Sequence, residues 1–304
     1  MKNLRLAVLL AAFLTACSSS STSPAPQAAV RHLYAAFLET GGSLVRYTSP
    51  FSSSSSPSVT LTDYTPLAPA APAAIGKNLY VLNDSVGAAT ITGFTTPISA
   101  SSTPSITINL TTENAYNLTA DASGDLWYSD RGGPTVGEFT PPFSDTSTPA
   151  LTLGTANGLV DDGPAQIAFD KSGNMAVAQE EGNDVLFFTA PITDVSVPTA
   201  TIPLTSGEGQ AVAFDSAGNL YASEYEATGI DVFTPPFSNT STPSFVIPTA
   251  EAVQCLQFSG SHLWTWDFTP EISDFAPPFS ASSTPVFNIT TGLQDFETCI
   301  GFGS

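Results

Sequence analysis

The stretch Phe233–Pro243 (FTPPFSNTSTP) determines how the rest of the chain is interpreted, because near copies of it recur along the 304 residues. Six copies can be aligned on their closing prolines, which are Pro57, Pro104, Pro149, Pro198, Pro243 and Pro285. Consecutive copies lie between 42 residues apart (243 to 285) and 49 residues apart (149 to 198). This period is typical of the four-stranded blades of a β-propeller.

One repeat unit shows four short strands. In the fifth repeat, apolar and β-branched runs alternate with clusters of Gly, Asn, Pro and Ser, which is the pattern of strands and turns. The predicted strands, named A to D from the axis outward, are Gln210–Phe214, Leu220–Ser223, Gly229–Phe233 and Ser244–Ile247. We therefore predict an all-β domain over residues 30–304, a six-bladed β-propeller of four-stranded antiparallel blades.

The two stereotyped motifs of each repeat have structural roles. An Asp-x-x-Gly-Asn sequence, as in Asp170–Asn174 and Asp215–Asn219, suits the turn between strands A and B, because Asp and Asn cap their own backbone and Gly accepts a positive φ. The aromatic or aliphatic residue of the second motif is expected to pack between blades. The residues in this slot are Phe51, Ile98, Phe143, Ile192, Phe237 and Phe279.

The first blade is predicted to be shared between the two ends of the domain. In the sixth repeat, Cys255–Ser261 runs directly into His262-Leu263-Trp264, whereas Cys299–Ser304 ends the sequence and the matching His32-Leu33-Tyr34 lies near its start. We predict that Cys299–Phe302 is the innermost strand of the first blade and that its outer three strands come from residues 32–61. This arrangement closes the ring.

Cys255 and Cys299 hold the same place in neighbouring blades. An oxidising compartment favours a disulfide between them. Side chains at equivalent positions of a rotational repeat, however, point in the same direction around the axis. One cysteine would therefore face the second, while the second would face away from the first. This geometry predicts two buried free thiols.

The N-terminus has the features of a secretory signal. Lys2 and Arg5 precede the apolar run Leu6–Leu14, which is too short to span a bilayer. The ending Leu14-Thr15-Ala16-Cys17 resembles the lipobox of bacterial lipoproteins. The resemblance implies that residues 1–16 are a signal peptide and that Cys17 is lipidated.

Residues 17–29 are rich in Ser, Pro and Ala and contain little that could be buried in a core. They are predicted to be a disordered tether between the lipid and the propeller. Together with the lipobox, this tether predicts a protein of the bacterial cell envelope, lipid-anchored at the outer membrane or the cell surface.

The charge balance restricts the possible partners. The full chain has 7 Lys and Arg against 27 Asp and Glu, and loss of the signal peptide would remove two of the basic residues. Nucleic acids and anionic membrane surfaces are therefore excluded as partners, apart from membrane attachment through the lipid. We expect a soluble, monomeric domain.

Most of the acidic residues fall on one face of the predicted propeller. We call the face formed by the A–B and C–D turns the turn face, and the face formed by the B–C and D–A loops the loop face. Four acids on the loop face, Asp130, Glu180, Glu224 and Asp267, recur near the ends of successive B strands. Because carboxylates suit hard cations, they are the candidate ligand or cation site, with Ca²⁺ as the possible ion and no other cofactor expected.

A family resemblance rests on Pro164–Asn174 (PAQIAFDKSGN) and the similar segment of the fifth repeat, each followed by a strand ending in an aromatic residue. These segments resemble NHL-type repeats and are similar to the six-bladed gluconolactonase group. The resemblance implies a divalent metal over the channel mouth, held by Glu, Asn and Asp. The corresponding residues here include no carboxylate, so the metal site does not carry over; they are Tyr116, Ala165, Gln210, Gln254 and Thr298.

Two functions remain open from the sequence. The first is a non-catalytic binding or scaffold module that presents its acidic loop face to a cation, a basic protein or a saccharide. The alternative is a metal-assisted hydrolase or lyase of the gluconolactonase type. His32 and His262 occupy the slot that holds Asn in sister repeats, so we interpret them as turn residues and not as general bases.

Overall fold

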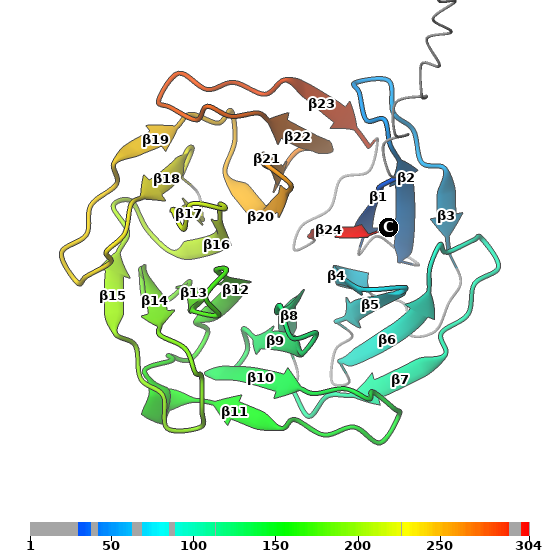
Figure 1. The fold of residues 1–304 in the computed structure, drawn as a ribbon, viewed down its shortest axis with the longest axis horizontal. Coiled ribbons are helices and arrows are strands. Elements are labelled where there is room, and N and C mark those ends of the chain that lie inside the picture. The colour runs from blue at the N-terminus through cyan, green and yellow to red at the C-terminus, as the bar shows by residue number, and fades with distance from the viewer. Residues whose placement is uncertain are drawn as a thin grey trace, which may run out of the picture.

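The computed structural model describes residues 30–37, 42–62, 69–84, 89–112, 114–225, 227–291 and 299–303. Six four-stranded antiparallel sheets stand around a common axis, as Figure 1 shows. This confirms the predicted all-β, six-bladed propeller. Within these ranges no helix is long and apolar enough to cross a bilayer. The predicted signal peptide, Cys17 and the tether lie outside the described residues.

Each blade contributes its strands in order from the axis outward. Blade 1 contains β24 (Ile300–Gly303), β1 (His32–Phe37), β2 (Ser43–Thr48) and β3 (Val59–Leu61), and blade 2 contains β4 (Pro69–Ile75), β5 (Asn78–Asn83), β6 (Thr90–Thr95) and β7 (Ile106–Asn109). Blade 3 contains β8 (Ala115–Ala120), β9 (Leu126–Asp130), β10 (Thr135–Phe139) and β11 (Leu151–Leu153), and blade 4 contains β12 (Pro164–Phe169), β13 (Met175–Gln179), β14 (Asp184–Phe188) and β15 (Ala200–Pro203). Blade 5 contains β16 (Gly209–Phe214), β17 (Leu220–Glu224), β18 (Ile230–Phe233) and β19 (Phe245–Ile247), and blade 6 contains β20 (Val253–Ser259), β21 (His262–Asp267), β22 (Glu271–Phe275) and β23 (Phe287–Thr290). A 3-10 turn, η1 (Thr155–Asn157), lies between blades 3 and 4.

The serine-rich motif forms the same turn in every blade. In blade 5 the Ser238 backbone N–H donates to Ser241 Oγ at 2.9 Å, and the Ser241 N–H donates back to the Ser238 carbonyl at 3.0 Å. The other five blades repeat the first of these bonds, and each blade has one cis X-Pro peptide at this turn. The low-complexity appearance of the motif therefore reflects a turn that satisfies its own backbone.

The Asp-x-x-Gly-Asn turns also form as predicted. Asp215 Oδ1 accepts the N–H groups of Ala217 and Asn219 at 2.8 and 2.9 Å, and its Oδ2 accepts Asn219 Nδ2 at 2.7 Å. Gly218 has a φ of 88°, which only glycine adopts without strain.

The aromatic residues of the repeated motif pack between blades. The Phe237 ring of blade 5 lies 4.9 Å from the Phe187 ring of blade 4, measured between centroids. Phe279 of blade 6 lies 5.6 Å from Tyr221 of blade 5 in an edge-to-face arrangement. Phe51 of blade 1 meets Trp264 of blade 6 in the same way, at 5.3 Å. The prediction of inter-blade packing is confirmed for these positions, and such pairs are among the more favourable aromatic contacts.

The C-terminal strand completes the first blade. β24 pairs antiparallel with β1, with Leu33 opposite Phe302 and Ala35 opposite Ile300. Every residue of β1 is buried. The closure predicted from the split motif is therefore confirmed, with Cys299 just before the first residue of the strand.

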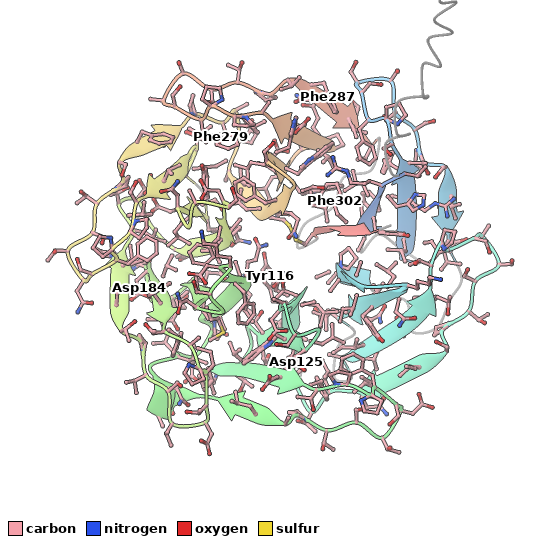
Figure 2. All side chains as sticks on the ribbon, in the orientation of Figure 1. Tyr116, Asp125, Asp184, Phe279, Phe287 and Phe302 are labelled. Carbon is pink, nitrogen blue, oxygen red and sulfur yellow. A yellow bond between two sulfur atoms is a disulfide. The ribbon has the colours of Figure 1, made fainter. Side chains whose placement is uncertain are left out.

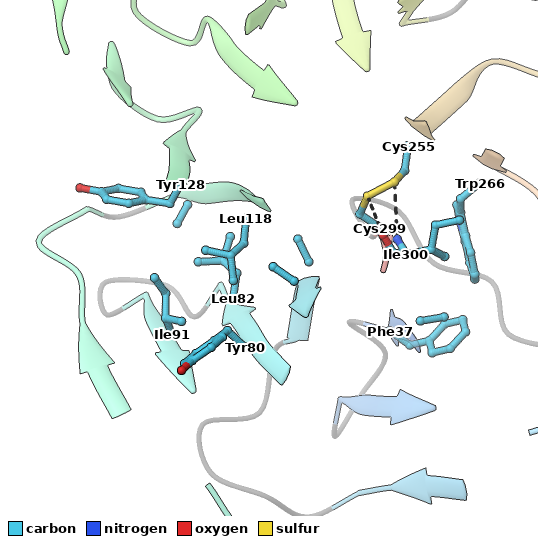
Figure 3. Close-up of a cluster of buried hydrophobic side chains, with 14 of the residues drawn as sticks. Phe37, Tyr80, Leu82, Ile91, Leu118, Tyr128, Cys255, Trp266, Cys299 and Ile300 are labelled. Atoms are coloured by element: carbon cyan, nitrogen blue, oxygen red, sulfur yellow. Dashed lines mark hydrogen bonds between the residues drawn. A yellow bond between two sulfur atoms is a disulfide. The ribbon is translucent and has the colours of Figure 1, made fainter. Parts of the chain in front are cut away.

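The prediction of two free thiols is wrong. Cys255 and Cys299 form a disulfide across a Cα–Cα distance of 5.2 Å, within the usual range for such a bond (Figure 3). The prediction assumed an ideal rotational repeat. The two backbones depart from that ideal, because Cys255 lies within β20, whereas Cys299 precedes the first residue of β24 and its N–H donates a 2.8 Å bond to the Ala70 carbonyl.

Candidate functional site

An extra residue interrupts the innermost strand of blades 2 to 6, always near its loop-face end. The pairing of strands A and B skips one residue there in blades 2, 3, 5 and 6, and in blade 4 Ala165 and Gln166 lie opposite the single residue Ala178. Two residues on one strand opposite one on its partner define a β-bulge. The residues at the skip are Ala70, Tyr116, Ala165, Gln210 and Gln254. Because bulges re-aim side chains at the rims of β structures, these residues form the channel mouth. Four of them are the positions that the family resemblance aligned with metal ligands; Thr298, the fifth, lies outside the described residues.

The mouth is filled with uncharged groups. Gln210 Nε2 of blade 5 donates a hydrogen bond to the Tyr116 hydroxyl of blade 3, so the two side chains span the intervening blade 4. Tyr116 lies toward the centre of the ring in Figure 2. The buried amide oxygens of Gln210 and Gln254 accept no hydrogen bond from the described residues. Acceptors of this kind bind ordered water or a ligand hydroxyl.

A second bridge joins blades 4 and 6 further along the inner strands. Gln166 of blade 4 accepts the Leu256 N–H of blade 6 at 3.0 Å and donates to the Leu256 carbonyl at 2.7 Å. Blade 5 lies between these two blades. Alternate blades are therefore joined at two levels, once between two side chains and once between a side chain and a backbone segment.

None of the four predicted acidic ligands belongs to a group of three or more side chains close enough to share an ion among the described residues. All four are buried, with exposed fractions between 5 % and 9 %. Asp130, Glu224 and Asp267 do occupy equivalent ends of strand B, but the strand register gives the corresponding place in blade 4 to Gln179 and not to Glu180. Three of the four acids that recur in the sequence therefore hold equivalent places in the structure, and Glu180 does not.

Three of these acids have contacts that fix the loop face. Glu180 Oε2 lies 2.5 Å from Arg131 Nε, and the Arg131 guanidinium also stacks 5.3 Å from the centre of the Tyr116 ring. Asp267 Oδ1 accepts the Thr269 N–H at 2.8 Å. Burial raises the pKa of Asp267, and the bonds from Thr269 oppose that shift.

Glu224 has the most specific role. Its Oε2 accepts the backbone N–H groups of Ser206 and Gly207 at 2.6 and 2.5 Å, so it holds the loop between blades 4 and 5. Asp231 is buried beside it, and Thr205 Oγ1 lies 3.4 Å from Glu224 Oε1 and 3.5 Å from Asp231 Oδ2. Burial, and then the Glu224 charge, raise the pKa of Asp231 to about 6.

Replacing Asp231 with Asn is expected to stabilise the protein at pH 7. Since the pKa of Asp231 is raised from 3.8 to about 6, the folded state binds this proton more tightly than the unfolded chain. The stabilisation of the folded state by protonated Asp231 is fully present below about pH 4 and is lost as pH rises through about 6. Asp231→Asn should therefore gain up to about 3 kcal/mol in unfolding free energy at pH 7 and little at pH 4.

Urea unfolding at several pH values measures this effect. Asp161→Asn is the matched control, because it removes the same charge from an exposed position of the loop face. If Asp161→Asn reproduced the pH-dependent gain of Asp231→Asn, general charge repulsion would be the cause, and the assignment to Asp231 would be wrong.

A pocket that the sequence did not reveal lies above Glu224. It has a volume of about 420 Å³ and opens on the loop face between blades 4 and 5. Its lining residues are Asn183, Ser206, Gly207, Glu208, Tyr225 and Ala227. Tyr225 is steadied by an edge-to-face contact with Phe268, with 5.5 Å between ring centroids. Only the variability of these loops could have indicated the pocket, because its residues come from three separate segments.

The sequence matches no family profile and no curated protein. The fold, in contrast, has clear structural relatives. A 6-phosphogluconolactonase candidate from Bacteroides uniformis is 15 % identical, with a TM-score of 0.65 over 90 % of this chain and 85 % of that one. The periplasmic gluconolactonase of Pseudomonas aeruginosa is 13 % identical, with a TM-score of 0.63 over 86 % of this chain and 83 % of that one.

A third relative is a chain of a nidogen–laminin complex, 14 % identical, with a TM-score of 0.64 over 91 % of this chain and 99 % of that one. At these identities the likeness establishes the six-bladed architecture alone. Proteins named as lactonases and a chain of a nidogen–laminin complex share that architecture, so function has to be argued from the residues.

The residues at the mouth do not fit the divalent metal of gluconolactonase-type enzymes. A hard cation needs several oxygen ligands, most of them carboxylates, whereas the described bulge residues are one Tyr, two Ala and two Gln. Among the described residues, the one group of acids close enough to share an ion is Asp121, Asp125 and Glu138. It lies at the turn face of blade 3, away from the mouth. We derive no metal-dependent step.

Proposed function

We propose that this protein is an extracytoplasmic, lipid-anchored β-propeller that binds a saccharide on its loop face without transforming it. The observation that carries the proposal is the pocket between blades 4 and 5, where the Tyr225 ring lies with Asn183, Ser206 and Glu208. Its volume of about 420 Å³ falls within the usual range of small-molecule sites.

The chemistry of the pocket suits a hydroxyl-rich ligand. Each sugar hydroxyl both donates and accepts, and the pocket offers a carboxylate acceptor in Glu208, an amide in Asn183 and a hydroxyl in Ser206. The apolar face of a sugar ring can pack on Tyr225. Because Glu224 already fixes the Ser206–Gly207 backbone, little ordering is needed on binding.

The extracytoplasmic location has support beyond the leader sequence. The Cys255–Cys299 disulfide is a bond that persists in oxidising compartments. One structural relative is a periplasmic protein.

The alternative is a metal-assisted hydrolase or lyase. It is favoured by the names of two structural relatives, but it would require ligands other than Tyr116, Gln210 and Gln254 at the mouth. Binding of a cation or a basic protein to the acidic loop face is a further interpretation of the same charges. Glu208 distinguishes these interpretations from the saccharide proposal. Binding of a cation or a basic protein requires the negative charge of Glu208, whereas saccharide binding does not.

Titration calorimetry tests the proposal. Purified protein is titrated in parallel with cellobiose, maltose, chitobiose, CaCl2 and tetralysine. We expect saturable heat with at least one disaccharide, with binding weakened about tenfold or more in Tyr225→Ala and by less in Glu208→Gln, because the amide keeps its hydrogen bonds. His32→Asn, on the opposite face, is the control and should leave binding unchanged.

Three outcomes would overturn the proposal. The first is heat with CaCl2 or tetralysine alone that disappears in Glu208→Gln, since this identifies a cation site. The second is turnover of a sugar lactone that depends on added metal, since this identifies the enzyme. The third is the absence of heat with every probe.

A further inference from the structure

A second pocket lies on the turn face, at the seam where blade 6 meets blade 1. It has a volume of about 200 Å³ and is independent of the loop-face pocket. Its lining residues are Arg31, Phe51, Ser259, His262, Trp264, Asp274 and Phe287. Figure 2 places Phe287 and Phe302 on this side of the ring. The pocket therefore combines cationic or polar donors with aromatic walls.

The polar end of the pocket is built around a buried carboxylate. Asp274 is 3 % exposed and contacts His262 Nδ1 through both oxygens, at 2.8 and 3.0 Å. The imidazole is thereby oriented with Nε2 outward, and Nε2 has no hydrogen-bond partner among the described residues. Arg31 reaches across the seam to donate from Nη1 to Ser259 Oγ at 2.8 Å. That bond uses one of the five N–H donors of its guanidinium.

The other end of the pocket is aromatic. Phe51 and Phe287 meet Trp264 edge to face, at 5.3 and 5.8 Å between ring centroids. Trp264 is almost fully buried, whereas the two phenylalanines are partly exposed. The volume of about 200 Å³ equals roughly six to seven water molecules in the liquid, which is enough for a compound with a single ring.

The repeat does not require a buried carboxylate at this position. The strand register gives the place of Asp274 in blades 1 to 5 to Arg46, Gly93, Glu138, Phe187 and Val232. Of the three charged residues at this place, Asp274 is buried, whereas Arg46 and Glu138 are partly exposed. The place of His262 is held by Asn219 in blade 5 and by His32 in blade 1. Because Phe187 and Val232 suffice for the fold and a buried carboxylate is costly, packing of the blade does not account for Asp274.

We propose that the seam pocket binds a small organic anion, namely a carboxylate attached to an apolar ring. The Arg31 guanidinium matches the planar shape of a carboxylate and can form two parallel bonds to it. His262 lies beside it as a second polar partner, oriented by Asp274. The ring of the ligand would occupy the space between Phe51, Trp264 and Phe287 and exclude water from the ion pair.

Benzoate is the test ligand, followed by calorimetry and by tryptophan fluorescence, since Trp264 forms a wall of the pocket. We expect saturable binding of benzoate to the wild type and weaker binding, by about tenfold or more, to Arg31→Met and to His262→Asn. The second variant carries the residue that sister repeats hold at this position. Acetate, which lacks the ring, should bind at least about tenfold more weakly than benzoate.

Two control variants show whether benzoate binds in the seam pocket and not elsewhere on the protein. Lys77→Met removes one exposed positive charge from another turn of the same face and should leave benzoate binding unchanged. Tyr225→Ala, in the loop-face pocket, should also leave it unchanged, so failure of the saccharide proposal would not affect this one. Melting temperatures without ligand show whether each variant is folded.

Two results would overturn the proposal. One is equal affinity for benzoate and acetate, which would indicate adventitious anion binding. The other is that folded Arg31→Met binds benzoate as the wild type does, or that the wild type does not bind it at about 10 mM. Arg31 would then serve only to fasten blade 1 to blade 6.

Discussion

A chain that ends at Gln294 is expected to be unfolded or aggregated at 25 °C, a temperature at which the full chain is folded. The truncation removes β24, whose Ile300 is 1 % exposed. Burial of this side chain alone is worth about 2 to 3 kcal/mol. The truncation also removes one cysteine of the disulfide and leaves β1, buried along its whole length, with an unpaired edge. These losses are a large part of the ~5–15 kcal/mol that stabilises a typical domain.

Circular dichroism melts and size-exclusion chromatography measure the effect. The control removes Ser18–Ala28, which belongs to the predicted tether, and should leave the melting temperature unchanged. A truncated chain that melts within a degree or two of the full chain would show that closure through β24 does not stabilise the ring.

Loss of the Cys255–Cys299 disulfide is expected to cost about 4 kcal/mol of unfolding free energy. The bond joins residues 44 apart in sequence, and the chain-entropy relation gives a value of this size for such a loop. Both cysteines are buried within the main hydrophobic cluster, beside Ile300 and Trp266 (Figure 3). The double variant Cys255→Ala/Cys299→Ala should therefore unfold at a lower urea concentration than the wild type.

Reductant provides the matched comparison. Adding it to the wild type should lower the midpoint toward that of the double variant, and adding it to the double variant should change nothing. Thiol titration of the unfolded, unreduced domain, expressed from Ala29 so that Cys17 is absent, should detect no free thiol. Two free thiols would show that the disulfide does not form in solution.

The architecture could be predicted because the signal was repeated six times. The spacing of the closing prolines indicated the blade length, and the motif split between Cys299–Phe302 and His32-Leu33-Tyr34 indicated how the ring closes. Turns such as Asp215–Asn219 could also be predicted, because their residues bond to their own backbone and need no distant partner. Local chemistry and periodicity therefore sufficed for the fold.

The candidate sites could not be predicted in the same way, because they depend on departures from the repeat. Cys255 lies within β20 whereas Cys299 precedes β24, so the two cysteines of the disulfide differ in their local structure. Strand pairing, and not sequence spacing, shows that Gln179 occupies the place that Glu180 was expected to hold. His262 begins strand β21 and contacts Asp274, twelve residues away on another strand. A turn position in the sequence gives no indication of that pair.

The positions of the two proposed pockets have a consequence for how the molecule can be used. The pockets share no lining residue and open on opposite faces, one between blades 4 and 5 and the other between blades 6 and 1. If both proposed pockets bind their ligands, occupancy of one should leave the dissociation constant of the other unaltered. The propeller would then act as two independent receptors on opposite faces of one domain.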